Sequence, residues 1–339
     1  MKKILSLITA LLLVFALAMF AACSGGSVAD TGKIEGNYKE PTSEELNAAL
    51  ESIDASKLFG DMSAEDWKFG VNVSADLSAS VKMGTTEMGS ASVELSYLFN
   101  VAAGEAGLDM KGAGSVSATV KESMTEEDGS SSMQTMEATA KAYNDSEYVY
   151  LNATAKQTGK EDATIKGNLS FDTIMSIVGG YLPMAADEEV EGGLTSGFDL
   201  TEIVAMLDTY GLKLEMDNSN GLKIKLSASK ETFDAIVDTV IGMMGVYDAE
   251  ESESSFIQFT TAVFELYIQI DKDGKFVAVA ANFNIVASVD ASAMMSANAA
   301  ADNNMTVTAK GVFAVEASSK TASLPADLNT YTEDLSALL

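Results

Sequence analysis

The sequence contains no arginine and no histidine, because all 21 basic residues of this 339-residue chain are lysines. It also contains one cysteine, Cys23. Without histidine there is no Ser-His-Asp triad, no Cys-His pair and no imidazole metal ligand, and one cysteine can neither close an intrachain disulfide nor build a zinc site. We therefore expect a protein that is not an enzyme, and we expect no bound metal and no cofactor.

Positive charge is scarce as well, with 21 lysines against 50 Asp and Glu and a net charge of −29. Nucleic-acid binding needs clustered cations that neutralise phosphates, and docking on anionic lipid needs a polybasic patch. The composition argues against both. Aromatic residues make up 7% of the chain with one tryptophan, which leaves little stacking surface for sugars, whereas 47% hydrophobic residues are enough for a folded core.

The N-terminus has the pattern of an export signal. Lys2 and Lys3 precede an apolar run over residues 4–22 that ends at Phe20-Ala21-Ala22-Cys23. This segment resembles a bacterial lipoprotein signal peptide, in which the Cys23 thiol would take diacylglycerol and cleavage would make Cys23 the first residue. The alternative is a signal anchor, since 19 apolar residues are just long enough to span a bilayer.

This resemblance implies a location and a domain organisation. Residues 1–22 would be the signal peptide, 23–40 a flexible glycine-containing tether, and 41–339 a single β-rich domain. We expect the protein at the extracytoplasmic face of a bacterial membrane, in a Gram-positive cell, with the lipid on Cys23 as its sole membrane attachment. The oligomeric state stays open.

Strand patterns dominate the rest of the chain. Over residues 69–83 every odd position is apolar or alanine and every even position is Gly, Asn, Ser, Asp or Lys, which is the period of two that a half-buried strand requires. The same alternation recurs over residues 91–101, 106–120, 136–142, 149–155 and 163–169, and long strands return at 256–270, 276–289 and 305–317. Strands of this length with one apolar side predict a large curved sheet.

Helical periodicity appears in four places. The first stripe follows Pro41, where Thr42 and Glu45 have capping-box spacing. Three further stripes, over residues 171–182, 200–207 and 233–244, form a helical insert near 171–246 that also contains a hairpin over 212–226. The sequence thus predicts an α+β fold, mainly antiparallel β, in which a half-open barrel of about 11 strands packs on about four helices.

This order of elements resembles the LolA/LolB-like fold, which is also found in LppX/LprG-type lipoproteins. The segments that carry the resemblance are residues 140–152 (AKAYNDSEYVYLN) and the terminal Leu324-Pro325-Ala326-Asp327. Members of this group form a half-open antiparallel barrel that binds lipid or acyl chains in its cavity. The chain lacks the arginine that carriers of the LolA type place inside the barrel.

Small side chains on the third long strand suggest where a ligand could bind. Gly112, Gly114 and Ala118 occupy apolar-side positions where tight packing on helices would require larger residues. We therefore predict an under-filled cavity for a lipid or another hydrophobic molecule. Its candidate lining residues are Leu108, Met110, Gly112, Gly114, Val116, Ala118, Met136, Val149 and Leu151.

Two other readings stay open. A structural or adhesive surface lipoprotein would have the same long strands without a cavity, and a solute-binding receptor would alternate strands and helices in two lobes, unlike this chain. The acidic clusters at 126–128, 187–191 and 248–253 lack the spaced ligands of a calcium loop, so we interpret them as solvated loops. Asp271-Lys272-Asp273-Gly274 is typical of a hairpin turn.

Overall fold

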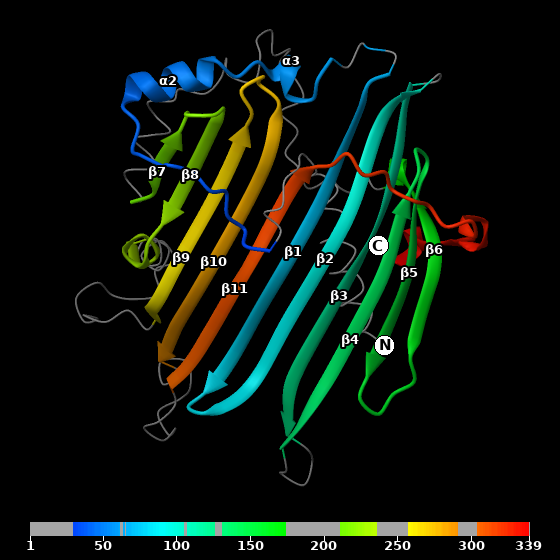
Figure 1. Ribbon diagram of the computed structural model, residues 1–339. Helices are drawn as coiled ribbons and strands as arrows, with labels where there is room; N and C mark the ends of the chain where they lie inside the picture. Colours follow the sequence, from blue (N-terminus) through cyan, green and yellow to red (C-terminus); the bar gives the residue numbers. More distant parts are fainter. Residues whose placement is uncertain are drawn as a thin grey trace.

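The structure of the chain, a computed structural model, describes residues 30–61, 64, 66–104, 107–125, 131–173, 211–235, 257–290 and 304–338. Twelve strands make one sheet (Figure 1). Their bounds are β1 Lys68–Met83, β2 Thr86–Gly104, β3 Gly107–Thr125, β4 Ser131–Asn144, β5 Tyr148–Gln157, β6 Ala163–Ser170, β7 Lys213–Asp217, β8 Leu222–Ala228, β9 Ile257–Ile270, β10 Phe276–Asp290, β11 Asn304–Ala317 and β12 Glu333–Asp334.

The sheet is open, with the strand order β12-β6-β5-β4-β3-β2-β1-β11-β10-β9-β8-β7. Every neighbouring pair is antiparallel except β12 with β6. The last long strand, β11, returns to pair with the first, so that β1 lies at the centre of the sheet between β2 and β11. The prediction of a large, mainly antiparallel sheet is confirmed.

The two sides of the sheet differ in chemistry because residues alternate along each strand. Val73 pairs with Tyr97 and Val315 on one side, which we call the apolar face. Ser74 pairs with Ser96 and Ala314 on the other, the polar face, which is turned toward the viewer in Figure 1. The predicted alternation in residues 69–83 therefore sorts core from surface as expected.

The first predicted helix is present as α2 (Ser43–Glu51), followed by the short α3 (Ala55–Leu58). Its capping box is formed: the Thr42 N–H donates to Glu45 Oε2 at 2.8 Å, and the Glu45 N–H donates to Thr42 Oγ1 at 3.2 Å. Ala49 of α2 and Ile53, two residues after its end, pack against Met216, Leu222 and Ile270 at the ends of β7, β8 and β9.

The described residues show fewer helices than the four expected. Of the three predicted insert helices, only the segments 171–173 and 230–235 lie within the described residues and are helical there, and the helix at 200–207 lies outside them. Helix packing across the apolar face therefore stays a prediction. The hairpin expected at 212–226 is confirmed as β7 and β8.

Residues 30–40, which we name the N-terminal strap, lie on the polar face across β7 to β11 (Figure 1). Ile34 is buried against Tyr267, Ala278, Ala280 and Ala314, and Lys39 forms a β-bridge with Met216. Gly32 has a φ of +60°, and a Cβ there would lie 2.3 Å from the Ala281 carbonyl oxygen. Glycine is required because the strap contacts the sheet so closely. Residues 30–40 of the segment expected to be a tether (23–40) are thus packed on the sheet.

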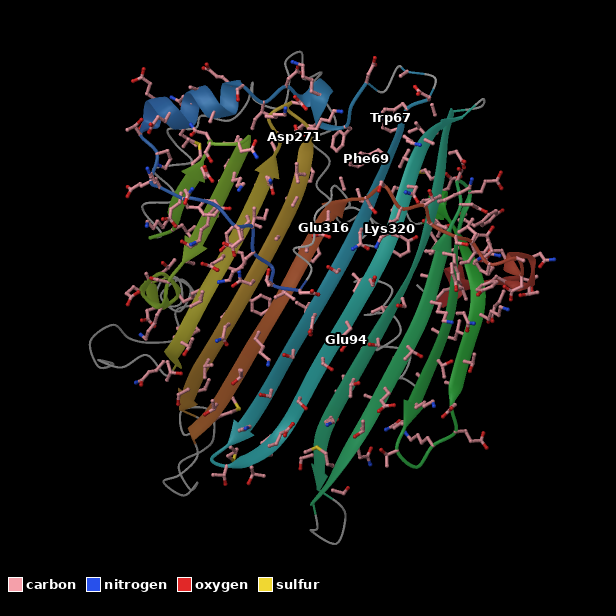
Figure 2. The ribbon with its side chains drawn as sticks, viewed as in Figure 1. Trp67, Phe69, Glu94, Asp271, Glu316 and Lys320 are labelled. Atoms are coloured by element: carbon pink, nitrogen blue, oxygen red, sulfur yellow. The ribbon has the colours of Figure 1, made fainter. Side chains whose placement is uncertain are left out.

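The C-terminal segment, residues 318–338, crosses the other half of the same face. Asn100 on β2 holds it twice, donating to the Lys320 carbonyl at 2.9 Å and accepting from the Ala322 N–H. Figure 2 labels Lys320 on this segment, in front of the sheet. Further on, Tyr331 stacks edge to face with Tyr143 and Tyr150. The chain then pairs with β6 as β12 and passes the sheet edge, since Leu335 joins the core cluster on the apolar face.

Candidate functional site

The structure brings the predicted cavity residues to one face. Register pairing across β3, β4 and β5 aligns Gly114 with Ala142 and Leu151, and Gly112 with Asn144 and Val149. Val116, Ala118, Val149 and Leu151 are buried in one core cluster, while Leu108, at 53% exposure, lies outside it at the strand end. Met110, Met136 and the two glycines share this apolar face. The prediction that these residues lie together on one face therefore agrees with the register.

The predicted gap at the two glycines is not there, because Tyr97 on the neighbouring strand fills it. A Cβ on Gly112 would lie 2.2 Å from the Tyr97 hydroxyl, and one on Gly114 would lie 2.4 Å from Tyr97 Cδ2. The ring is fully buried, and its hydroxyl donates to Asn144 Oδ1. Burial raises the pKa of Tyr97, which keeps the hydroxyl protonated as a donor. The glycines accommodate an aromatic ring and leave no empty space for a ligand.

Large apolar side chains remain partly exposed at the centre of the apolar face. They come from five adjacent strands and lie in two neighbouring rows of the sheet. We name them the central apolar patch: Leu77, Val93, Phe264, Leu266, Phe283 and Phe313. Gly311 lies between Leu77 and Phe283, whose side chains come within 2.5 and 3.0 Å of where its Cβ would be. This patch spans β9, β10, β11, β1 and β2, whereas the predicted site lies on β3 to β5.

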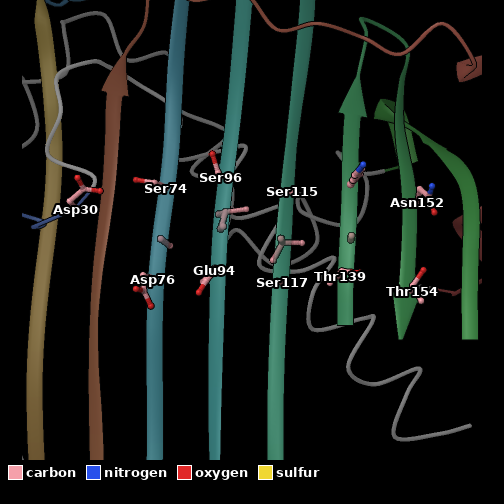
Figure 3. Close-up of a pocket in the computed structure, with 15 residues that line it drawn as sticks. Asp30, Ser74, Asp76, Glu94, Ser96, Ser115, Ser117, Thr139, Asn152 and Thr154 are labelled. Carbon is pink, nitrogen blue, oxygen red and sulfur yellow. The ribbon is translucent and has the colours of Figure 1, made fainter. Parts of the chain in front are cut away.

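A shallow polar trough of about 620 Å³ crosses the opposite face over β1 to β5 (Figure 3). Hydroxyls line much of it, from Ser74, Ser96, Ser115, Ser117, Thr139 and Thr154. Asp30 of the N-terminal strap lies at one end, and Lys141 is the single basic residue in the lining. The Ser74 hydroxyl is buried and has no hydrogen-bond partner among the residues that the structure describes. The trough can therefore exchange hydrogen bonds with polar groups.

Charged groups hold the strap to the polar face. Glu265 lies within 3.1 Å of both Lys33 and Lys225, and Asn282 Nδ2 donates to it at 3.0 Å. Burial raises the pKa of Glu265, but hydrogen bonds from Asn282, Lys33 and Lys225 outweigh that effect and lower the pKa to about 2. Asp217 accepts from Ser219 and from the Asn37 N–H, which lowers its pKa to about 2. In their ionised form these two carboxylates hold the N-terminal strap against the sheet.

The described part of the chain contains no group of three or more Asp, Glu, His or Cys residues arranged to hold a metal. The acidic clusters at 126–128, 187–191 and 248–253 lie outside the described residues. The segment after β9 is the predicted turn: Asp271 Oδ1 accepts from the Asp273 and Lys275 N–H groups, and Gly274 has a φ of +81°. That interpretation is confirmed.

Among the described residues, no helix has the length and hydropathy needed to cross a bilayer. Cys23 and the signal segment lie outside the described residues. No protein-family model matches the chain, and no curated protein sequence is significantly similar to it. The resemblance to LolA/LolB-like lipoproteins therefore stays a prediction from sequence.

Two features of these sites were not predicted from the sequence. The first is the place of Tyr97, which fits the strand alternation as one more apolar position but lies against Gly112 and Gly114 of the neighbouring strand. The second is the strap, whose Ile34 and Tyr38 are four residues apart in a glycine-containing segment without strand periodicity. The spacing of these two residues was the one signal available, since both pack near Tyr267.

Proposed function

We propose that this chain is a bacterial lipoprotein, anchored outside the cytoplasmic membrane through Cys23, that holds a lipid or another hydrophobic ligand against the apolar face of its sheet. The resemblance of the N-terminus to a lipoprotein signal supports the anchor. The resemblance of the element order to LolA/LolB-like carriers, with an open sheet of 12 strands, supports the ligand class.

The central apolar patch is the observation that carries this proposal. Its six side chains are large, they lie on neighbouring strands, and each keeps part of its surface exposed. Burying such a surface against an acyl chain is favourable by about 25 cal/mol per Å² of apolar area. We place the ligand there and not over the glycines of β3, where Tyr97 already occupies the space.

Two adjacent residues of β11 test the ligand site. Phe313 belongs to the patch, whereas Val312 faces Asp76 and Asn282 on the polar face. We would purify the full chain carrying Cys23→Ser, so that no lipid is attached covalently, and measure co-purified lipid by solvent extraction and mass spectrometry. We expect lipid with the parent protein, much less with Phe313→Ser, and the parental amount with Val312→Ser.

The controls separate binding from stability. Both variants should keep the far-ultraviolet circular dichroism of the parent, and lipid recovery is compared only between folded samples. Absence of lipid from the parent protein, or equal recovery from both variants, would reject the ligand site. Retention of the processed Cys23→Ser protein in the membrane fraction of cells would reject the anchor.

A further inference from the structure

The N-terminal strap begins near the centre of the polar face. Asp30, the first described residue, lines the polar trough together with Ser74 and Asp76, which lie halfway along β1 (Figure 3). β1 itself has five strands on one side before the short β12 and five on the other. Asp30 therefore lies close to the middle of the sheet, both along the strands and across them.

The strap cannot easily shift this exit point, because it is held along its length. The Gly32 carbonyl accepts from Asn282 Nδ2 at 3.3 Å, and Lys33 pairs with Glu265 at 3.1 Å. Ile34 is 4% exposed, and the ring of Tyr38 lies 5.8 Å from that of Tyr267. Apolar burial, an ion pair and hydrogen bonds thus fix the strap independently of one another.

The chain between Cys23 and Asp30 is short compared with the sheet. Seven residue steps separate them, and even a fully extended chain spans at most about 3.6 Å per step, or about 25 Å. From the middle of β1, either end of the strand is about 26 Å away at about 3.3 Å per residue. Either long edge is about 24 Å away at about 4.8 Å per strand, and a sheet with its side chains adds about 10 Å of thickness.

A tether of this length just reaches an edge of the sheet, but it is too short to pass around the edge to the apolar face. A lipid on Cys23 would need more than about 30 Å of chain to reach the bilayer from the apolar face, and about 25 Å is the limit. We propose that the polar face of the sheet is held against the membrane surface, with the trough over the lipid head groups and the apolar face directed away from the bilayer. This orientation rests on the proposed lipid anchor at Cys23.

The charge of the polar face is compatible with this position. All eleven lysines in β1 to β11 lie on it, together with nine carboxylates whose side chains are described, so the face is close to neutral although the chain carries −29. The lysines are Lys68, Lys82, Lys111, Lys121, Lys141, Lys156, Lys166, Lys213, Lys223, Lys225 and Lys310. A near-neutral face is repelled less by anionic head groups than the average surface of this protein.

The orientation deepens the proposed function. A ligand on the central apolar patch would face away from the membrane that carries the anchor. It would therefore be exchanged with a partner or surface on the outer side, and a direct exchange with the underlying bilayer would require the protein to detach or turn over.

Adjacent residues of β1 allow a matched test. Ser78 lies on the polar face, opposite Ser92, and Ala79 lies on the apolar face, opposite Ala91. In lipidated protein the Cys23 thiol is blocked, so Ser78→Cys or Ala79→Cys supplies the single reactive thiol. Each variant would be labelled with a small fluorophore and reconstituted in phosphatidylethanolamine and phosphatidylglycerol vesicles that contain a quencher on the lipid head group.

We expect the label of the Ser78→Cys variant to lose most of its fluorescence and the label of the Ala79→Cys variant to lose little. Equal quenching of both, or stronger quenching at position 79, would overturn the orientation. Mass spectrometry of the N-terminal peptide is run on the same samples. A peptide without acyl chains would refute the lipid anchor itself, which is a different failure from an acylated protein with equal quenching.

A second variant tests the cause. A 20-residue Gly/Ser insertion between Gly26 and Ser27 adds about 25 Å of root-mean-square reach and more at full extension. If the short tether sets the orientation, quenching of the two labels should become similar in this background. Unchanged quenching would show that the tether does not set the orientation.

Discussion

The two halves of the sheet differ in the size and the burial of the side chains on their apolar face. Strands β2 to β6 present small residues on the apolar face, such as Ala140, Ala142 and Ala153, and bury them almost completely in one cluster with Tyr97. Strands β9 to β11 present Leu266, Phe283 and Phe313, which stay partly exposed. Residue size alone is therefore a poor guide to empty space, because the half with the smallest side chains is the more tightly packed one.

Removing a ring from each half should give the largest difference between them. Tyr97→Ala removes a fully buried ring that covers two glycines, and we expect it to lower the free energy of unfolding by about 3–5 kcal/mol. Phe283→Ala in the other half should cost clearly less, because Phe283 keeps part of its surface in solvent. Urea unfolding followed by circular dichroism measures both. Equal losses would mean that the halves are packed alike.

Adding a methyl group tests the same contrast from the other side. In Gly114→Ala the new Cβ would lie 2.3 Å from the Ser96 carbonyl oxygen and 2.4 Å from Tyr97, so backbone or a buried ring must move. We expect a loss of about 1–3 kcal/mol through overpacking. In Gly311→Ala the closest atom, at 2.5 Å, is the end of the partly exposed Leu77 side chain, which can turn away. The nearest backbone atom is the Asp76 carbonyl oxygen at 2.9 Å, farther than the 2.3 Å at Gly114.

Gly311→Ala should therefore cost less than Gly114→Ala in the same unfolding measurement. Ala113→Val is a control for Gly114→Ala, since position 113 faces Leu98 on the polar side of the same strand. If Gly114→Ala left the free energy of unfolding unchanged, there would be unfilled space between Gly114 and Tyr97, as the sequence predicted.

Period-two alternation explains how much of the fold could be predicted. The alternation predicted the long strands and the side of each that is buried, because successive side chains of a strand point to opposite faces of the sheet. The close contact of Tyr97 with Gly114 depends on the register of β2 with β3, in which Gly104 pairs with Gly107. The sequence left that register open, so the pairing, and with it the filled gap, could not be predicted.

The strap could not be predicted for a different reason. Its contacts with Tyr267, Asn282 and Glu265 join residues more than 200 positions apart. The one local signal, the spacing of Ile34 and Tyr38, does not indicate which part of the chain they contact. Its glycines were interpreted as signs of flexibility. At Gly32 the missing side chain serves close packing on the sheet.

Acid should weaken the half of the sheet that carries the strap. The pKa of Glu265 is lowered to about 2 from an ordinary 4.5, so the folded state favours its ionised form. Its contribution is complete above pH 4.5 and is lost as the pH falls toward 2. We expect Glu265→Gln to remove part of the decrease in unfolding free energy over that range. Urea unfolding of the parent protein and of the Glu265→Gln variant over that pH range measures this difference.

Two lysines provide the smallest and last contrast. Lys33 pairs with Glu265 at 3.1 Å, and the carboxylate side chain is only 14% exposed, whereas Lys156 and Asp162 are 3.9 Å apart with side chains 61% and 55% exposed. We expect Lys33→Met to lower the free energy of unfolding by up to about 1 kcal/mol and Lys156→Met to leave it nearly unchanged. Urea midpoints in low salt and in 1 M salt check this. The effect of Lys33→Met should persist largely in salt, because ions screen exposed charges more strongly than buried ones. If the effect vanished in salt, this ion pair would not hold the strap on the sheet.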